Sequence, residues 1–68
     1  MDKELILQNN LQRIRKSKKI SQDELAKMIG TTRQTIISIE KGVFNPSAKL
    51  ALLLCIALEV KFEEIFYF

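Results

Sequence analysis

Residues 21–42, SQDELAKMIGTTRQTIISIEKG, constrain the fold more than any other part of the chain. Ser21 stands three residues before Glu24, which is the spacing of a capping box, in which two side chains satisfy free amides at the start of a helix. Gly30 follows the apolar residues of this helix and can adopt the left-handed backbone that a sharp corner requires. We therefore expect two short helices joined by a tight turn. The core-facing stripe of the first comprises Leu25, Met28 and Ile29.

The second helix of this pair has two faces of different chemistry. It is capped by Thr31 or Thr32 and ends at Gly42. When successive residues are placed about 100° apart, Ile36 and Ile39 fall on the side that faces the core. The opposite side points away from the core; its residues are Arg33, Gln34, Ile37, Ser38 and Lys41.

The outward face carries the groups that read base edges in the major groove of DNA. Arginine pairs with the two acceptors of guanine, glutamine pairs with adenine, a hydroxyl pairs with either, and an alkyl side chain contacts the thymine methyl group. A solvated polar face is the simpler interpretation of an amphipathic helix. Ile37 argues against it, because a branched apolar residue among polar ones needs something to contact. The pattern therefore favours a helix that reads DNA.

On these residues the chain resembles the Cro/repressor-type, XRE-like helix-turn-helix family of prokaryotic and phage regulators. The likeness extends from about Leu11 to Ile65, and NPSAKLAL followed by VKFEEIF is most similar to the short stand-alone regulators of the cytolysin-repressor kind. The positions that carry the resemblance are Gln22, Leu25, Ala26, Gly30, Thr32-Arg33-Gln34-Thr35-Ile36, Ile39-Glu40-Lys41-Gly42 and Asn45-Pro46-Ser47.

The resemblance implies an all-α fold of five helices, in which the second and third helices form the DNA-binding motif. In the short stand-alone members the chain ends add a small antiparallel strand pair, and the protein is a single-domain dimer. The family also has a semi-buried ion pair that bridges the first and third helices. In this chain the corresponding residues are Arg15 and Glu40, and we expect their role to be structural.

The resemblance also assigns DNA contacts, position by position. It implies that the base-reading residues are Thr32, Arg33, Gln34 and Ser38, with Ile37 at an exposed recognition position. It implies that the residues on the phosphate backbone are Gln22, Lys41, Val43 and Asn45. Val43 could take part only through its backbone amide, because its side chain cannot donate a hydrogen bond.

Positive charge accompanies the motif. Eleven Lys and Arg against eight Asp and Glu give a net charge of +3. Residues 1–46 hold nine basic and five acidic groups, whereas residues 47–68 hold two and three. A basic cluster just before the motif would attract phosphate, although such a cluster by itself is more often a solvated helix end. It comprises Arg13, Arg15, Lys16, Lys18 and Lys19, of which we assign Lys18 and Lys19 to phosphate binding.

The segment after the motif predicts an apolar fourth helix. Asn45 and Pro46 are suited to be its N-cap and first residue, and it runs to about Glu59. Every residue between Lys49 and Glu59 is apolar, so this helix has no polar face. Nine such residues span only about 13.5 Å against about 30 Å for a bilayer core, so we expect no membrane insertion. One chain of 68 residues has too thin a core to enclose the helix, so we expect a second subunit to cover part of it.

The chain ends supply the remaining elements. Apolar residues at Leu7, Leu11 and Ile14 predict a first helix over residues 8–17. Residues 4–7 and 65–68 have strand-like composition and are expected to pair antiparallel. The aromatic tail could close the core or contact a second subunit, and for Phe62 and Ile65 both remain open. We assign to the dimer interface Leu54, Leu58, Val60, Phe62, Phe66 and Phe68.

The polar residues exclude most other classes of function. With no histidine and one cysteine, neither a usual metal site nor an intrachain disulfide is expected. Cys55 is interpreted as a small buried hydrophobe, with a thiol sensor as the alternative. No nucleophile has a nearby base and no glycine-rich phosphate loop is present, so we expect no enzyme activity, cofactor or small-molecule substrate. Met1–Glu4 is charged and Leu5–Leu7 is too short for a secretion signal, which favours the cytoplasm.

The sequence thus predicts one domain, residues 1–68, that binds double-stranded DNA as a homodimer. Its expected function is transcriptional regulation by occupying an inverted-repeat operator, most simply as a repressor. The alternative is an antitoxin or adaptor that holds a protein partner through the apolar fourth helix and the tail. Sedimentation would distinguish these two functions. A homodimer covers its apolar surface with the second copy, whereas an adaptor leaves that surface free for another protein.

Overall fold

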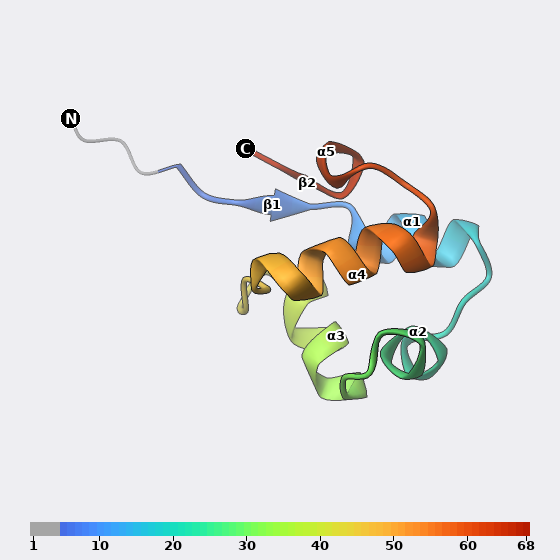
Figure 1. The fold of residues 1–68 in the computed structure, drawn as a ribbon. Coiled ribbons are helices and arrows are strands. Elements are labelled where there is room, and N and C mark those ends of the chain that lie inside the picture. Colours follow the sequence, from blue (N-terminus) through green and yellow to red (C-terminus); the bar gives the residue numbers. More distant parts are fainter. Residues whose placement is uncertain (1–4) are drawn as a thin grey trace.

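Within residues 5–68, five short helices follow one another between two strands that pair with each other (Figure 1). The computed structural model describes residues 5–68, so the charged segment Met1–Glu4 lies outside the described residues. The expected five-helix fold with a small sheet from the chain ends is confirmed. Its elements are β1 (Gln8–Asn9), α1 (Leu11–Ser17), α2 (Gln22–Ile29), α3 (Arg33–Glu40), α4 (Ala48–Leu58), α5 (Phe62–Ile65) and β2 (Phe66–Tyr67).

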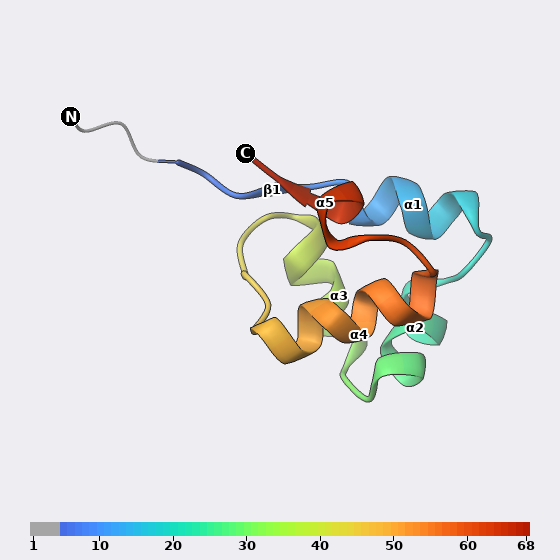
Figure 2. The ribbon, with the colours of Figure 1, turned by 45° about the horizontal axis from the view of Figure 1, so that its top comes forward.

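The two strands join the ends of the described chain (Figure 2). They are antiparallel, with Gln8 opposite Tyr67 and Asn9 opposite Phe66. The N-terminal strand therefore lies a few residues later than residues 4–7, where the sequence suggested it. For the same reason the first helix begins at Leu11 rather than at residue 8. Gln8 and Asn9 continue the helical pattern of the sequence, but they pair with Tyr67 and Phe66 at the other end of the chain instead.

Asn9 connects the sheet to two helices. Its side-chain oxygen accepts a hydrogen bond from the amide of Leu11 at 3.0 Å, at the start of α1. Its side-chain nitrogen donates to the carbonyl oxygen of Ile39 at 2.9 Å, in the last turn of α3. Both partners are backbone groups at helix ends, which have no partner within their own helix. Asn9 therefore fixes the position of α3 relative to the sheet and α1.

The fourth helix begins later than the sequence suggested. Its N-cap is Ser47, whose hydroxyl accepts a hydrogen bond from the amide of Leu50 at 3.2 Å. The expected N-cap and first residue, Asn45 and Pro46, lie in the preceding loop. Serine is a favoured N-cap residue because its hydroxyl can accept a hydrogen bond from a free amide of the first turn. With Ser47 as the cap, Pro46 lies outside the helix. The helix ends where Glu59 adopts a left-handed conformation, with φ of 58°.

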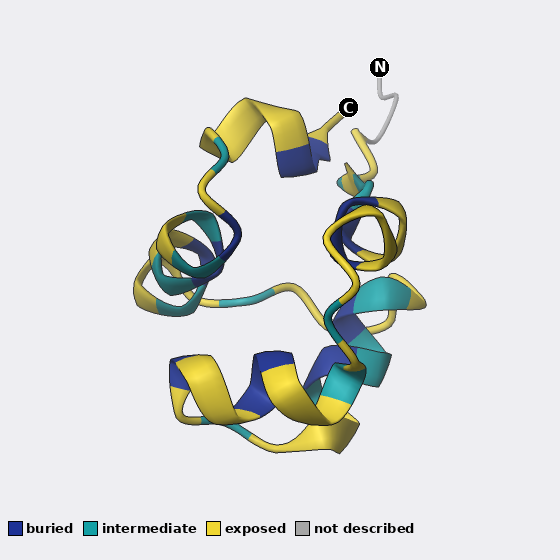
Figure 3. Ribbon diagram, turned by 90° about the vertical axis from the view of Figure 1, so that its right-hand side faces the viewer, coloured by how far each residue is buried: buried dark blue, intermediate teal, exposed yellow. Residues whose placement is uncertain are grey.

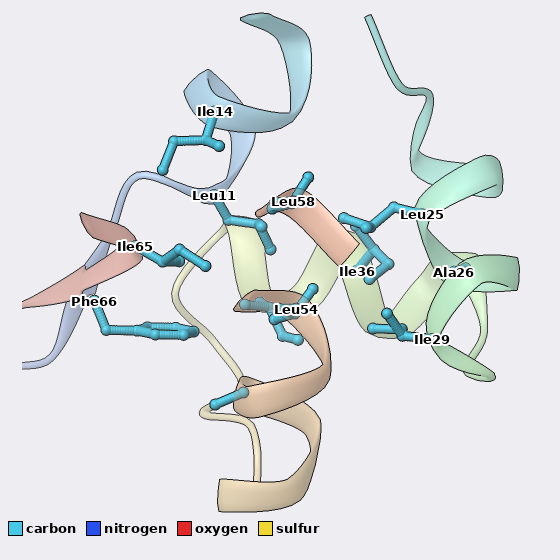
Figure 4. Packing of buried hydrophobic residues seen from close by; sticks show 12 residues of the cluster. Leu11, Ile14, Leu25, Ala26, Ile29, Ile36, Leu54, Leu58, Ile65 and Phe66 are labelled. Carbon is cyan, nitrogen blue, oxygen red and sulfur yellow. The ribbon is translucent and has the colours of Figure 1, made fainter. Parts of the chain in front are cut away.

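The buried side chains of the helices meet in one core (Figure 4). The buried faces of the helices point toward the centre of the molecule, and the exposed faces point outward (Figure 3). The motif helices α2 and α3 contribute to this core together with α1, α4, α5 and β2. The core residues are Leu11, Ile14, Leu25, Ala26, Ile29, Ile36, Ile39, Ala51, Leu54, Leu58, Ile65 and Phe66.

The core includes three residues that we had assigned to the dimer interface. Leu54 and Leu58 are fully buried, and Phe66 is 3% exposed, within a single chain. A second subunit cannot contact side chains that have no free surface, so this part of the assignment is wrong. Residue 65 belongs to the core as well, whereas Phe62 and Phe68 remain exposed. The sequence could not separate these groups, because core and interface both select apolar residues.

Helix α4 keeps an apolar face that the rest of the chain does not cover. Leu52 and Ile56, one helical turn apart, are 59% and 71% exposed. Met28 on α2 is also largely exposed, although the sequence placed it in the core stripe. Among residues 5–68, no helix is long and apolar enough to cross a membrane.

Candidate nucleic-acid interface

The corner between α2 and α3 is built from the local signals that the sequence contains. At its start, Ser21 Oγ accepts from the amide of Glu24 at 3.0 Å, and Glu24 Oε1 accepts from the amide of Ser21 at 2.7 Å. The Ser21 amide, and then its hydroxyl, hold the pKa of the Glu24 carboxyl below its ordinary value. At the corner itself, Gly30 has φ of +74°. The predicted capping box and left-handed glycine are both confirmed.

The start of α3 is fixed in the same way. Thr32 is the N-cap, and its hydroxyl accepts from the amide of Thr35 at 3.2 Å. The two threonine hydroxyl oxygens are also 3.0 Å apart. The Thr32 oxygen is therefore engaged at the helix start, although the residue as a whole is exposed. This geometry decides between the two caps that the sequence left open.

Helix α3 presents one face to the core and another to solvent. Ile36 and Ile39 are fully buried, as expected. Arg33 and Gln34 are exposed, and Ile37 and Ser38 are half-buried on the same outward side. Gln34 Nε2 lies 3.4 Å from Ser38 Oγ, one turn further along the helix. The structure thus groups the expected base-reading residues along one side of a helix whose other side is anchored in the core.

A buried ion pair ties α3 to α1. Arg15 Nε donates to Glu40 Oε2 at 2.6 Å, and Arg15 Nη2 donates to Glu40 Oε1 at 3.3 Å. The two side chains are only 7% and 4% exposed. Arg15 Nη1 also donates to the carbonyl oxygen of Ile20 at 2.9 Å. The bidentate geometry leaves neither charge unpaired, which confirms the structural pair expected from the family likeness.

Gln22 is held by the same carboxylate. Its Nε2 donates to Glu40 Oε1 at 3.0 Å, so the side chain is oriented in the first turn of α2. Its amide oxygen and second N–H have no such constraint and are available to a ligand. An open hollow of about 580 Å³ lies beside this side chain. Its lining residues are Gln12, Arg15, Lys16, Ser21, Gln22, Asp23 and Arg33.

A smaller hollow of about 210 Å³ lies against a different set of α3 residues. One of its walls is Phe44, in the loop between α3 and α4, which our sequence reasoning did not select. The signal was available, because an aromatic residue between Val43 and Asn45 lies in the segment expected to approach DNA. The residues that line this hollow are Thr32, Gln34, Thr35, Ser38 and Phe44.

The segment after α3 changes one expected phosphate contact. Lys41, Val43 and Asn45 are all exposed. However, the amide of Val43 already donates to the carbonyl oxygen of Ser38 at 3.1 Å. Because the side chain cannot donate, this internal hydrogen bond leaves Val43 without a donor for phosphate, and its assignment is wrong. Lys41 and Asn45 keep exposed side chains that can reach a ligand.

The basic turn before the motif is also exposed. Lys18 and Lys19 lie between α1 and α2, and Lys19 adopts a left-handed backbone with φ of 60°. Their charges are free to act at a distance on a polyanion.

Over the described residues there is no group of acidic, Cys or His side chains that could hold a metal ion. Partial burial, and then the Glu63 carboxylate, raise the pKa of the Cys55 thiol.

This geometry agrees with comparisons to known proteins. Residues 11–65 match the model of the family described as Helix-turn-helix. The chain belongs to this family. Its Cro/repressor-type members are transcriptional regulators rather than enzymes, as the sequence predicted.

Similar curated proteins carry the same description. The chain is 44% identical over 62 residues to the uncharacterized HTH-type transcriptional regulator MJ0272 of Methanocaldococcus jannaschii, covering 91% of this chain and 94% of that protein. It is 39% identical over 61 residues to the HTH-type transcriptional regulator YgzD of Bacillus subtilis, covering 90% and 92%. The likeness therefore covers nearly the whole of each relative.

Solved structures share the fold. The restriction-modification controller protein C.AhdI from Aeromonas hydrophila is 33% identical and superposes with a TM-score of 0.75, over 79% of this chain and 78% of that chain. A structure described as a putative DNA-binding protein from Bacteroides fragilis reaches a TM-score of 0.82 over 90% and 98% of the two chains. At 18% identity the second match concerns the fold alone.

Proposed function

We propose that this protein is a repressor that binds an inverted-repeat operator in double-stranded DNA as a homodimer. The observation that carries the proposal is the arrangement of α3. Arg33 and Gln34 are exposed on a helix whose opposite face, at Ile36 and Ile39, is completely buried. A rigid helix with exposed polar side chains can enter a major groove and keep its register there.

The expected division of labour on DNA follows from position. The residues that read base edges are Thr32, Arg33, Gln34, Ile37 and Ser38. Phosphates are bound at the two ends of the motif, where exposed donors lie on either side of α3. These residues are Gln22, Lys18, Lys19, Lys41 and Asn45.

The homodimer is proposed from the uncovered apolar face of α4. Leu52 and Ile56 are more than half exposed, and Phe62 and Phe68 are 47% and 67% exposed. Together with the half-buried Val60, these side chains replace the buried ones that we had assigned to the interface. Two copies related by a twofold axis would cover them and place two α3 helices in successive major grooves, about 34 Å apart.

We also propose where in the cell the protein acts. A regulator of this kind acts in the cytoplasm, where it meets chromosomal DNA. The finer likeness to the cytolysin-repressor kind stays a prediction that rests on NPSAKLAL and VKFEEIF.

Selection from random DNA duplexes at a stated salt concentration tests the proposal. The expected result is an inverted repeat whose half-sites are one helical turn apart. A parallel sedimentation experiment without DNA should show a dimer. If the selected duplexes shared no consensus sequence, the proposal that α3 reads DNA would be wrong. A chain that stays monomeric and captures a different protein would instead support the antitoxin or adaptor function.

A further inference from the structure

The smaller hollow beside α3 is lined by one aromatic ring and by polar side chains. Phe44 is 46% exposed, so the ring forms a wall of the hollow and still faces solvent. Gln34 and Ser38, from α3, line the same hollow. Exposing an aromatic ring to water costs free energy, and burial against a ligand would recover part of it. The hollow is therefore suited to bind an apolar group next to a polar one.

The position of Gln34 narrows the nature of that group. Its amide lies 3.4 Å from Ser38 Oγ, which keeps the side chain on the flank of α3 that borders the hollow. A glutamine amide pairs with the major-groove edge of adenine. On the same edge of an A·T pair, thymine carries a C5-methyl group, the apolar group that the major groove offers. An amide beside an aromatic wall thus matches the chemistry of an A·T step.

We propose that Phe44 is a specificity-determining residue that receives a thymine methyl group in the hollow it forms with Gln34 and Ser38. This inference rests on the proposed function, since it requires α3 to lie in the major groove. The ring contacts the methyl group from the loop side, and Thr35 also lines the hollow, in the first turn of α3. The consequence is a preference for thymine at a base pair approached from the loop, in addition to any thymine that Ile37 contacts on the outward face of α3.

Replacing thymine by 2′-deoxyuridine tests the methyl contact directly, because only the methyl group is removed. The probe is the duplex obtained by selection on the parent protein, with each thymine of one half-site replaced in turn. At one position we expect the Kd to rise about fourfold, the effect of losing one buried methyl group. For Phe44→Ala, the same replacement should leave the Kd unchanged.

A neighbouring residue provides the matched control. Val43 is 75% exposed and does not line the hollow, so Val43→Ala should keep the fourfold response. Phe44→Leu should keep a reduced response, and far-UV circular dichroism should show that all variants are folded. A deoxyuridine effect that persists in Phe44→Ala, or a selected half-site without thymine, would overturn the inference. Failure to select any consensus would instead overturn the proposed function.

Discussion

Helices α3 and α4 both expose a face to solvent, but the two faces have opposite chemistry. The exposed residues of α3 include Arg33 and Gln34, whereas those of α4 include Leu52 and Ile56. α3 is also fixed by a buried ion pair at its end, whereas the inner face of α4 is held by apolar packing. A polar face held rigidly suits a polar groove, and an apolar face suits a second protein surface. The comparison therefore supports the two proposals, that α3 reads DNA and that α4 contacts a second copy of the chain.

The largest effect is expected where α3 is anchored. Arg15→Met should lower the free energy of unfolding by about 3 to 5 kcal/mol, because it leaves the Glu40 carboxylate buried and unpaired. The double variant Arg15→Met, Glu40→Leu should recover most of this loss. Urea unfolding followed by circular dichroism measures both. If the double variant were as unstable as the single one, the ion pair would not be what holds α3.

The second effect concerns the apolar face of α4. Ile56→Lys should break the homodimer and raise the Kd for an inverted repeat about a hundredfold, because linked binding to two half-sites is lost. The monomer should remain folded, since this side chain is 71% exposed. Sedimentation and fluorescence anisotropy on the selected duplex measure the two changes.

The matched control places the same charge on another exposed apolar residue. Met28→Lys, on α2 and 53% exposed, should leave the protein dimeric in sedimentation. Dissociation of both variants would show that added positive charge, rather than the α4 face, disrupts the dimer. Dissociation of neither would remove α4 from the interface.

The polar face of α3 should affect specificity rather than stability. Arg33→Ala should reduce discrimination at one base pair of each half-site by about 1 to 3 kcal/mol, the range for a bidentate contact. Repeating the duplex selection with the variant measures this change. Arg13→Ala removes an exposed charge from α1 and should weaken binding without altering the consensus. An unchanged consensus for Arg33→Ala would exclude this residue from base reading.

The smallest effect concerns the cap of α2. Ser21→Ala should cost about 1 kcal/mol of stability. The native-state pKa of Glu24 is lowered, so its contribution is present above the ordinary carboxyl pKa and is lost as the pH falls through the lowered value. Glu24→Gln should remove this part of the acid sensitivity. Thermal unfolding at neutral and acidic pH measures this sensitivity. An equal loss of stability on acidification in the parent protein and in Glu24→Gln would show that Glu24 does not contribute to it.

Much of the motif was predictable because its signals are local. Ser21, Glu24 and Gly30 act on amides and dihedral angles within a few residues of themselves, so their roles are independent of the rest of the fold. The Arg15–Glu40 pair was accessible only through the family likeness, because the two residues are far apart in sequence. The position of the strands was misjudged, since it depends on pairing between opposite ends of the chain.

The candidate interface shows the same division. Arg33 and Gln34 were identified from helical periodicity, which alone separates them from Ile36 and Ile39. Phe44 lies in the segment that the sequence placed near DNA, but only the fold of the loop shows that this residue lines a hollow beside α3. The amide of Val43 was assigned to phosphate because no pattern reveals that it donates within the chain.

The sequence by itself determined the corner, the two motif helices and the polar face of α3, because capping, glycine conformation and a 3.6-residue repeat act over short distances. The tertiary structure alone decided which apolar residues of α4 are core. Leu54 and Leu58 are buried while Leu52 and Ile56 are exposed, although all four belong to one uniformly apolar run. Where every position is apolar, periodicity carries no information, and the orientation of the helix is set by what it packs against.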